Sequence, residues 1–120
     1  MKKIVFMLIA ASSLILAQTY TTTAAANHLG EQATVCRIVL GGYYARSSKG
    51  QPTFINLDGA YPSQKFTIVI WGDDRYKFKS PERRYNNKKL CATGIIGSHN
   101  GIPQIVVSNM SQLHRGDVNE

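Results

Sequence analysis

The chain has 120 residues and carries 14 Lys and Arg against 7 Asp and Glu, a formal net charge of +7. This length allows one small domain and excludes a large multi-domain enzyme. Two Cys are too few for a disulfide-dense scaffold or a four-ligand zinc site. The three His, which are His28, His99 and His114, form no HxxxH pair. We therefore expect no metal and no cofactor.

The first 17 residues have the layout of a secretory signal peptide. Lys2 and Lys3 precede an apolar run over 4–17, which is too short for a membrane span. We expect cleavage after Ala17, with Ala26 as the alternative and an uncleaved anchor as the less favoured interpretation. Removal of 1–17 leaves twelve basic and seven acidic residues, a net charge of +5. The sequence thus predicts an exported bacterial protein, periplasmic or secreted, that is not an integral membrane protein.

The first half of the remaining chain predicts a short helix and three strands. The helix covers 22–28 and ends before Gly30. A long strand over 33–45 contains adjacent glycines at its centre, which indicate a bend. Strands over 53–57 and 65–71 follow, separated by turn-forming residues. Alternation in the third strand places Phe66, Ile68 and Ile70 on one face and Thr67, Val69 and Trp71 on the other.

The second half predicts two more strands after a charged linker. We expect a short helix or turn around 73–78 and irregular chain from Pro81 onward. Strands follow over 88–96 and 103–108, joined by a turn containing Asn100-Gly101, and 116–120 form a frayed tail. Five strands with the longest linker between the third and fourth favour an all-β fold, a five-stranded Greek-key OB-fold barrel over 18–115. A β-sandwich would need more strands.

Four segments resemble the small secreted bacterial OB-fold proteins. They read HLGEQATVCRIV, SSKGQPTFINLDGAYPSQKFTIVIWGDD, KKLCATGII and GIPQIVVSNMSQL, and together they span about residues 25–113. Similar segments occur as accessory domains beside nuclease-type domains. The resemblance implies the OB-fold and, more weakly, nucleic-acid binding. The similarity to the barrel of staphylococcal-type nucleases is distant, and their catalytic carboxylates and arginines have no counterpart in this sequence.

The region 75–89 concentrates positive charge. Clustered cations attract phosphate backbones, and Tyr76, Phe78 and Tyr85, which lie between them, could stack on bases. The alternative is a solvated surface linker, attracted to anionic lipid or polysaccharide or to nothing in particular. The basic residues of this segment are Arg75, Lys77, Lys79, Arg83, Arg84, Lys88 and Lys89, of which the first five are candidate nucleic-acid contacts.

A second candidate surface lies on the strands. OB-folds bind ligands across their second and third strands, between the first and fourth loops. If Ile55 and Leu57 point inward, Phe54 and Asn56 point outward. The alternative is that Phe54 and Trp71 pack beneath the N-terminal helix or the 73–85 segment. The candidate contacts on the strands and loops are Tyr44, Arg46, Lys49, Phe54, Asn56, Thr67, Trp71 and His99.

The two cysteines fall in the first and fourth predicted strands. These strands are neighbours in an OB-fold barrel, so Cys36 and Cys91 are candidates for a disulfide, which an oxidising compartment would permit. Closing so long a loop would contribute on the order of 3–4 kcal/mol. The alternative is two separate buried thiols.

These features together predict an exported, non-catalytic protein that binds single-stranded DNA or RNA. One alternative is a binding module for a polysaccharide, a small ligand, another anionic partner or a protein. A minimal hydrolase is a further alternative, but it would need convergent Asp, Glu or His side chains, and the sequence offers few of them.

Overall fold

The structure is a computed structural model, and it describes residues 18–116. The predicted signal peptide and residues 117–120 of the predicted tail lie outside the described residues. The described chain is mostly β-strand, with a few short helices. Its elements are β1 (Gln18–Tyr20), η1 (Ala24–Asn27), β2 (Gln32–Tyr44), β3 (Thr53–Leu57), β4 (Phe66–Ile70), α1 (Gly72–Arg75), α2 (Pro81–Arg84), β5 (Lys89–His99), β6 (Ile102–Val106), η2 (Met110–Gln112) and β7 (Leu113–Arg115).

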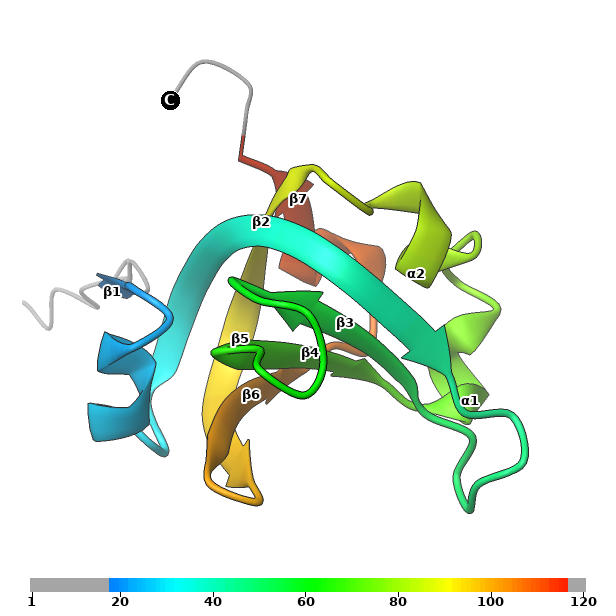
Figure 1. Ribbon diagram of the computed structural model, residues 1–120, viewed down its shortest axis with the longest axis horizontal. Helices are drawn as coiled ribbons and strands as arrows, with labels where there is room; N and C mark the ends of the chain where they lie inside the picture. Colours follow the sequence, from blue (N-terminus) through cyan, green and yellow to red (C-terminus); the bar gives the residue numbers. More distant parts are fainter. Residues whose placement is uncertain (1–17, 117–120) are drawn as a thin grey trace, which may run out of the picture.

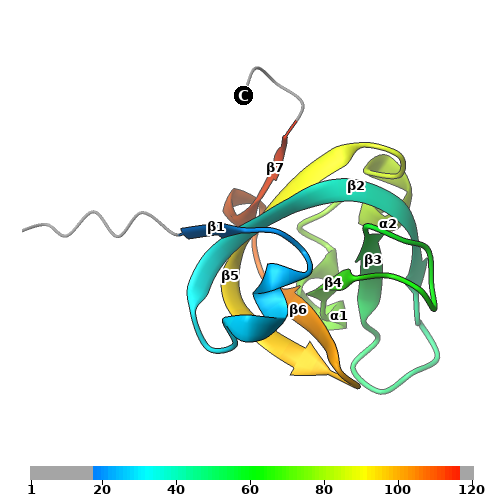
Figure 2. The same ribbon diagram turned by 60° about the vertical axis from the view of Figure 1, so that its left-hand side comes forward.

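Five strands form a closed ring, shown in Figure 1 and from another side in Figure 2. The pairing order is β2, β3, β4, β6, β5, and β5 pairs again with β2. Within the ring only β4 and β6 are parallel. These five strands match the five predicted ranges to within two residues at each end, except that β5 continues to His99, three residues past its predicted end and into the predicted turn. The short strands β1 and β7, which pair with β2 and β5, were not predicted because three residues carry no readable alternation.

The long strand β2 bends at its glycines, as the sequence predicts. The register with β3 shifts between Val39 and Gly42, and Gly41 has a φ of +86°, a conformation that glycine adopts without steric cost. On one side of the bend β2 pairs with β5, through Ile38, and on the other side it pairs with β3. One strand therefore joins both halves of the ring, and Figure 1 shows it arching over them.

The core fills the inside of the ring. Inward side chains such as Val35, Ile55, Ile68 and Ile105 are fully buried. The two ends of the ring are covered by different segments, with η1 at one end and α1 and α2 at the other (Figure 1). Ala25 of η1 belongs to the core cluster, as do Phe78 and Tyr85 from the region around α1 and α2.

Two expectations about helices need correction. The N-terminal helix is a single 3-10 turn, shorter than the predicted 22–28. The chain after Pro81 is not irregular, because Pro81 opens a second short helix, α2. Proline lacks an N–H, which the first turn of a helix does not need, so it starts this helix and does not interrupt one.

A disulfide links β2 to β5. Cys36 and Cys91 stand directly opposite each other in the antiparallel register, with their Cα atoms 4.0 Å apart and a bond between their sulfurs. The predicted disulfide is confirmed, and the alternative of separate thiols is excluded. Across residues 18–116, no helix has the length and apolar content needed to span a membrane.

Candidate functional site

An apolar row crosses the outer surface of the ring. Phe54 stands opposite Tyr43 on one side and Val69 on the other, and Val69 stands opposite Val106. These side chains point outward because their neighbours along the strands, such as Ile55 and Ile68, point into the core. Tyr43 is 66% exposed, Phe54 is half-buried and Val69 is buried. The predicted outward direction of Phe54 is therefore what the register shows.

A polar row lies next to the apolar row, one step further along the strands. Asn56 stands opposite Thr67, Thr67 opposite Gln104, and Gln104 opposite Gly97. Asn56 and Thr67 are nevertheless buried, and Gln64 Nε2 donates a hydrogen bond to Thr67 Oγ1 at 3.4 Å. A ligand on this surface meets Gln104 more readily than the two residues that the sequence nominated.

Trp71 lies where β4 ends, against the loop between β2 and β3. A Cβ added to Gly50 would come within 3.0 Å of its ring, so the indole packs closely on that loop. The side chain is 43% exposed and borders a cleft of about 340 Å³, which Gln51 and Asp73 also line. Trp71 therefore packs on the loop between β2 and β3, and Asp73, at the start of the 73–85 segment, lines the same cleft. The free surface of Trp71 is available for stacking.

The predicted contacts around Trp71 come from the same loop and the following helix. Arg46 and Lys49 belong to the loop and are exposed. Lys77, from the turn after α1, donates hydrogen bonds to Asp74 Oδ1 at 2.9 Å and to the Ser108 carbonyl at 3.0 Å. The hydrogen bond that Lys77 donates to Asp74 raises the pKa of Lys77. Because Ser108 closely follows β6, Lys77 joins the basic region to the edge of the outer surface beside Trp71.

Arg75 has a different environment from the other cations. It donates to both carboxylate oxygens of Glu82, at 2.9 and 3.1 Å, and to Thr53 Oγ1 at 2.6 Å. Its guanidinium carbon lies 3.7 Å from the centre of the Tyr44 ring. We call Tyr44, Thr53, Arg75 and Glu82 the end-cap cluster, since it closes one end of the ring. Tyr44 and Arg75, both nominated as contacts, are engaged with each other here.

The end-cap cluster also sets the ionisation of its carboxylate. Burial is the largest single influence and by itself would raise the pKa of Glu82. The hydrogen bonds from Arg75, a backbone hydrogen bond and the positive charges of Arg75 and Arg83 together lower it by more, so the pKa lies below its usual range. The pair therefore stays charged at neutral pH. A guanidinium held this way stabilises the packing of α1 and α2 and has little freedom to meet a phosphate.

Three further cations of the basic region are open to solvent, whereas Lys88 and Lys89 are half-buried. Lys79, Arg83 and Arg84 are exposed, and Arg84 lies 5.3 Å from the centre of the Tyr85 ring. The aromatic residues predicted to interleave with them divide into two kinds. Tyr76 is 81% exposed, whereas Phe78 and Tyr85 are buried in the core. Only Tyr76 of the three is placed to stack on a base.

His99 lies at the other end of the outer surface. His99 ends β5, next to the turn that precedes β6. Because β4 and β6 run parallel and side by side, that turn lies near the start of β4, whereas Trp71 follows the end of β4. Five strand residues separate these ends, about 16 Å. His99 is exposed, so the candidate contacts border the outer surface at both ends.

Four of the five acidic side chains among residues 18–116 are engaged within the protein, and the fifth, Asp73, is exposed and lines the cleft beside Trp71. Glu31 accepts hydrogen bonds from Tyr20 and contacts His28, and Asp58 accepts from Thr22 and pairs with Arg37. The hydrogen bond from Tyr20 lowers the pKa of Glu31, and the one from Thr22 lowers the pKa of Asp58. With Asp74 and Glu82 bound to Lys77 and Arg75, four carboxylates of the described chain are engaged within the protein.

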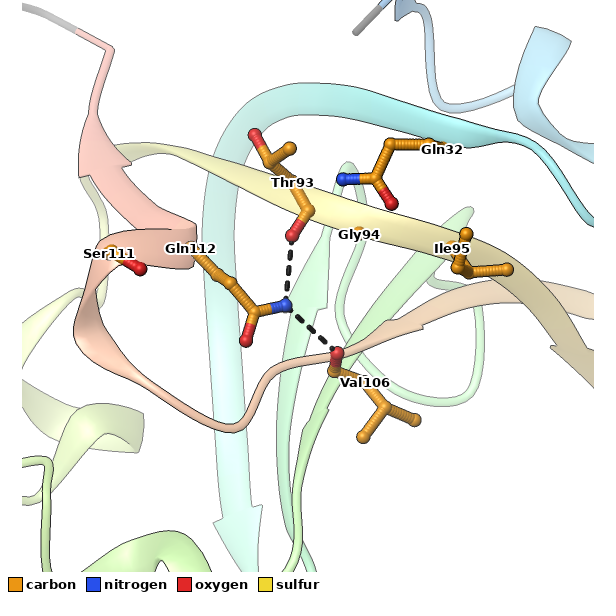
Figure 3. A pocket seen from close by; sticks show the side chains of 7 residues that line it. All are labelled: Gln32, Thr93, Gly94, Ile95, Val106, Ser111 and Gln112. Atoms are coloured by element: carbon orange, nitrogen blue, oxygen red, sulfur yellow. Dashed lines mark hydrogen bonds between the residues drawn. The ribbon is translucent and has the colours of Figure 1, made fainter. Parts of the chain in front are cut away.

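The sequence did not reveal a groove beside the apolar row. It holds about 630 Å³ between β5 and β6 where these strands separate, and Gln112 from η2 reaches into it (Figure 3). The Gln112 amide nitrogen donates to the Thr93 and Val106 carbonyls at 3.0 and 3.3 Å. Ile95, 55% exposed, and Val106 border the groove. The sequence pattern that could have predicted this groove is weak, because outward-facing apolar residues on short strands do not differ from ordinary strand alternation.

Comparison with known proteins gives a likeness of fold alone. No protein-family model and no curated protein matches the sequence. One solved structure with a similar fold is titled a putative aspartyl-tRNA synthetase from Leishmania major Friedlin, with a TM-score of 0.51 and 6% sequence identity. The match covers 89% of this chain and 22% of that one. This chain therefore corresponds to about a fifth of the length of that protein.

Proposed function

We propose that the ring is an OB-fold barrel. Its strands in chain order are β2, β3, β4, β5 and β6, and the order around the ring is the first, second, third, fifth and fourth. The parallel pairing of β4 with β6 and the position of α1 and α2 between the third and fourth strands support this assignment. The similar solved structure is named as a tRNA synthetase, which agrees with a fold used by nucleic-acid-binding proteins.

We further propose that this is an exported, non-catalytic protein that binds single-stranded nucleic acid. The observation that carries the proposal is the meeting of exposed aromatic surface and exposed cations at one edge of the outer surface. There Trp71 packs on the loop that carries the exposed Arg46 and Lys49, and Lys77 donates a hydrogen bond to the Ser108 carbonyl just beyond β6. The confirmed disulfide is compatible with export.

The two kinds of surface would divide the work of binding. Exposed Lys and Arg attract phosphates and release counterions, so affinity falls as salt rises. Aromatic side chains stack on bases and contribute about 1–3 kcal/mol per base with little sequence preference. Trp71 and Phe54 would stack, while Arg46, Lys49, Lys79, Arg83 and Arg84 would meet phosphates.

The direct test is fluorescence anisotropy with a labelled single-stranded oligonucleotide and the purified, disulfide-bonded chain, across a salt series. The double variant Arg83→Ala/Arg84→Ala should weaken binding and reduce the salt slope by about 0.7 for each phosphate that the variant no longer neutralises. Binding should also quench Trp71, the single tryptophan.

The matched control removes two positive charges elsewhere. Arg37, on β2, pairs with Asp58, and Lys65, just before β4, lies near the same carboxylate. Asp58 follows the end of β3 that is opposite to Thr53 and the end-cap cluster, where α2 packs. Arg37→Ala/Lys65→Ala should therefore keep the slope of the unmodified protein. An equal decrease of the salt slope in both variants would show that the effect depends on net charge and not on the position of the arginines. A lack of binding at low salt would refute the proposal and direct attention to polysaccharide or protein partners.

A further inference from the structure

Gly97, in β5, is a glycine that the fold itself does not require. A Cβ added there would meet no atom within 4 Å, and its φ is outside the left-handed region. Gly42 and Gly94 are different, since a Cβ at either would come within 2.7 Å of another atom. Glycine within a strand lowers stability by about 0.5–1 kcal/mol relative to alanine. Glycine within a strand often marks a bulge, a tight bend, or a close approach by a ligand or another backbone. The register of β5 with β6 runs through Gly97 without a shift, so Gly97 forms no bulge there.

Gly97 lies on the outer surface and ends the polar row. It stands opposite Gln104, and the neighbouring pair, Ile96 and Ile105, is buried in the core, so Gly97 and Gln104 face outward. Two residues away on β5 is Ile95, which borders the groove in Figure 3. The result is a flat stretch of bare backbone between an exposed aliphatic side chain and an amide.

The groove and the Gly97 position share one chemical character. The groove lining, drawn from residues 18–116, contains amides, hydroxyls and aliphatic groups, and no charged side chain. The Gln112 amide donates to the backbone carbonyls of Thr93, within β5, and Val106, at the end of β6. Its oxygen accepts from the backbone N–H groups of Ser108 and Asn109, so the amide is fully occupied. Gln104, in contrast, is half-buried beside the bare backbone of Gly97. This surface suits a flat, uncharged ring with hydrogen-bonding edges.

We infer that Gly97 seats a base of the bound single strand, with its edge toward the Gln104 amide. This inference rests on the proposed function and extends the interface from β3 and β4 onto β5 and β6. Charge complementarity selects the occupant: a chain that keeps a net charge of +5 without residues 1–17, with four carboxylates engaged internally, favours a polyanion. The phosphates would meet the exposed cations, and a base would occupy the uncharged surface.

The test compares Gly97→Val with Ser98→Val, which adds similar bulk to the next residue, on the opposite face of the strand. Thermal unfolding and oligonucleotide anisotropy are measured for both. Gly97→Val should leave the melting temperature unchanged or raise it, since β-branched residues suit strands, and should weaken binding about tenfold by displacing one stacked base. Gly97→Ala should weaken binding less, and Ser98→Val should bind like the unmodified protein.

Gln104→Ala supplies a second readout. If Gln104 meets a base edge, the unmodified protein should prefer oligo-dA over oligo-dT, because a Gln amide pairs with two groups of adenine. Gln104→Ala should reduce the difference in affinity between oligo-dA and oligo-dT. If the unmodified protein binds and both Gly97→Val and Gly97→Ala bind as tightly as it does, the inference is overturned and the proposed function stands. If the unmodified protein binds no oligonucleotide, both fall.

Discussion

Replacing Arg75 by alanine should damage the fold, whereas replacing Arg83 should not. Both residues belong to the same basic stretch of sequence, but only Arg75 is part of the end-cap cluster. Arg75→Ala removes two hydrogen bonds to Glu82 and one to Thr53, together with the packing on the Tyr44 ring. It also leaves the Glu82 carboxylate largely buried without its cation.

The expected cost is about 3 kcal/mol. A hydrogen bond to a charged group contributes about 1.5–3 kcal/mol, but the side chains of Arg75 and Glu82 are 20% and 13% exposed, so solvent screens part of the interaction. We therefore count the three hydrogen bonds at about 1 kcal/mol each, within the range for partly exposed groups. For a domain of this size the melting temperature should fall by about 15 °C.

Thermal and urea unfolding, followed by circular dichroism, measure this cost directly. Arg83→Ala is the matched control: it removes the same charge from an exposed side chain and should change stability by less than about 0.5 kcal/mol. Below its melting temperature, Arg75→Ala should bind an oligonucleotide as the unmodified protein does. Equal stability of the two variants, with no binding by Arg75→Ala, would show that Arg75 is a contact residue and that the end-cap cluster has no structural role.

Three further predictions concern the fold. Gly42→Ala should destabilise the protein by about 1–3 kcal/mol in urea unfolding, because its Cβ would lie 2.7 Å from the Phe54 carbonyl and 2.8 Å from Glu82 Cβ; unchanged stability would contradict the tight packing of α2 on β2. Cys36→Ala/Cys91→Ala should lower the free energy of unfolding by about 4 kcal/mol, since the disulfide closes a loop with a sequence separation of 55. Free-thiol titration of the unmodified protein, denatured without reduction, should find no thiol. Asp58 has a lowered pKa, so its contribution is present above the unfolded pKa of about 3.9 and is lost as pH falls through the lower folded value. Asp58→Asn, which tolerates the φ of +57° at this position, should show a smaller fall in melting temperature between about pH 5 and pH 2; identical pH profiles would rule out this linkage.

Local sequence patterns predicted the strands well. The alternation in β4, the short apolar runs of β3 and β6 and the paired glycines of β2 depend on residues close together in the chain, and each element formed where its pattern indicated. The helical expectations were less accurate, because short helices depend on tertiary packing more than on propensity. Pro81 illustrates this, since the same residue can end one helix or begin the next.

The sequence by itself determined the composition of the basic region 75–89: many cations, few acidic residues, and aromatic residues between the cations. Which of these groups are free was decided only by the tertiary structure. Arg75 and Arg83 are alike in sequence, yet Glu82, Thr53 and Tyr44 surround one and solvent surrounds the other. Tyr76 and Tyr85 differ in the same way, one exposed and one in the core. Burial and pairing depend on groups that are distant in the chain and meet only when the ring closes, so no local pattern could record them.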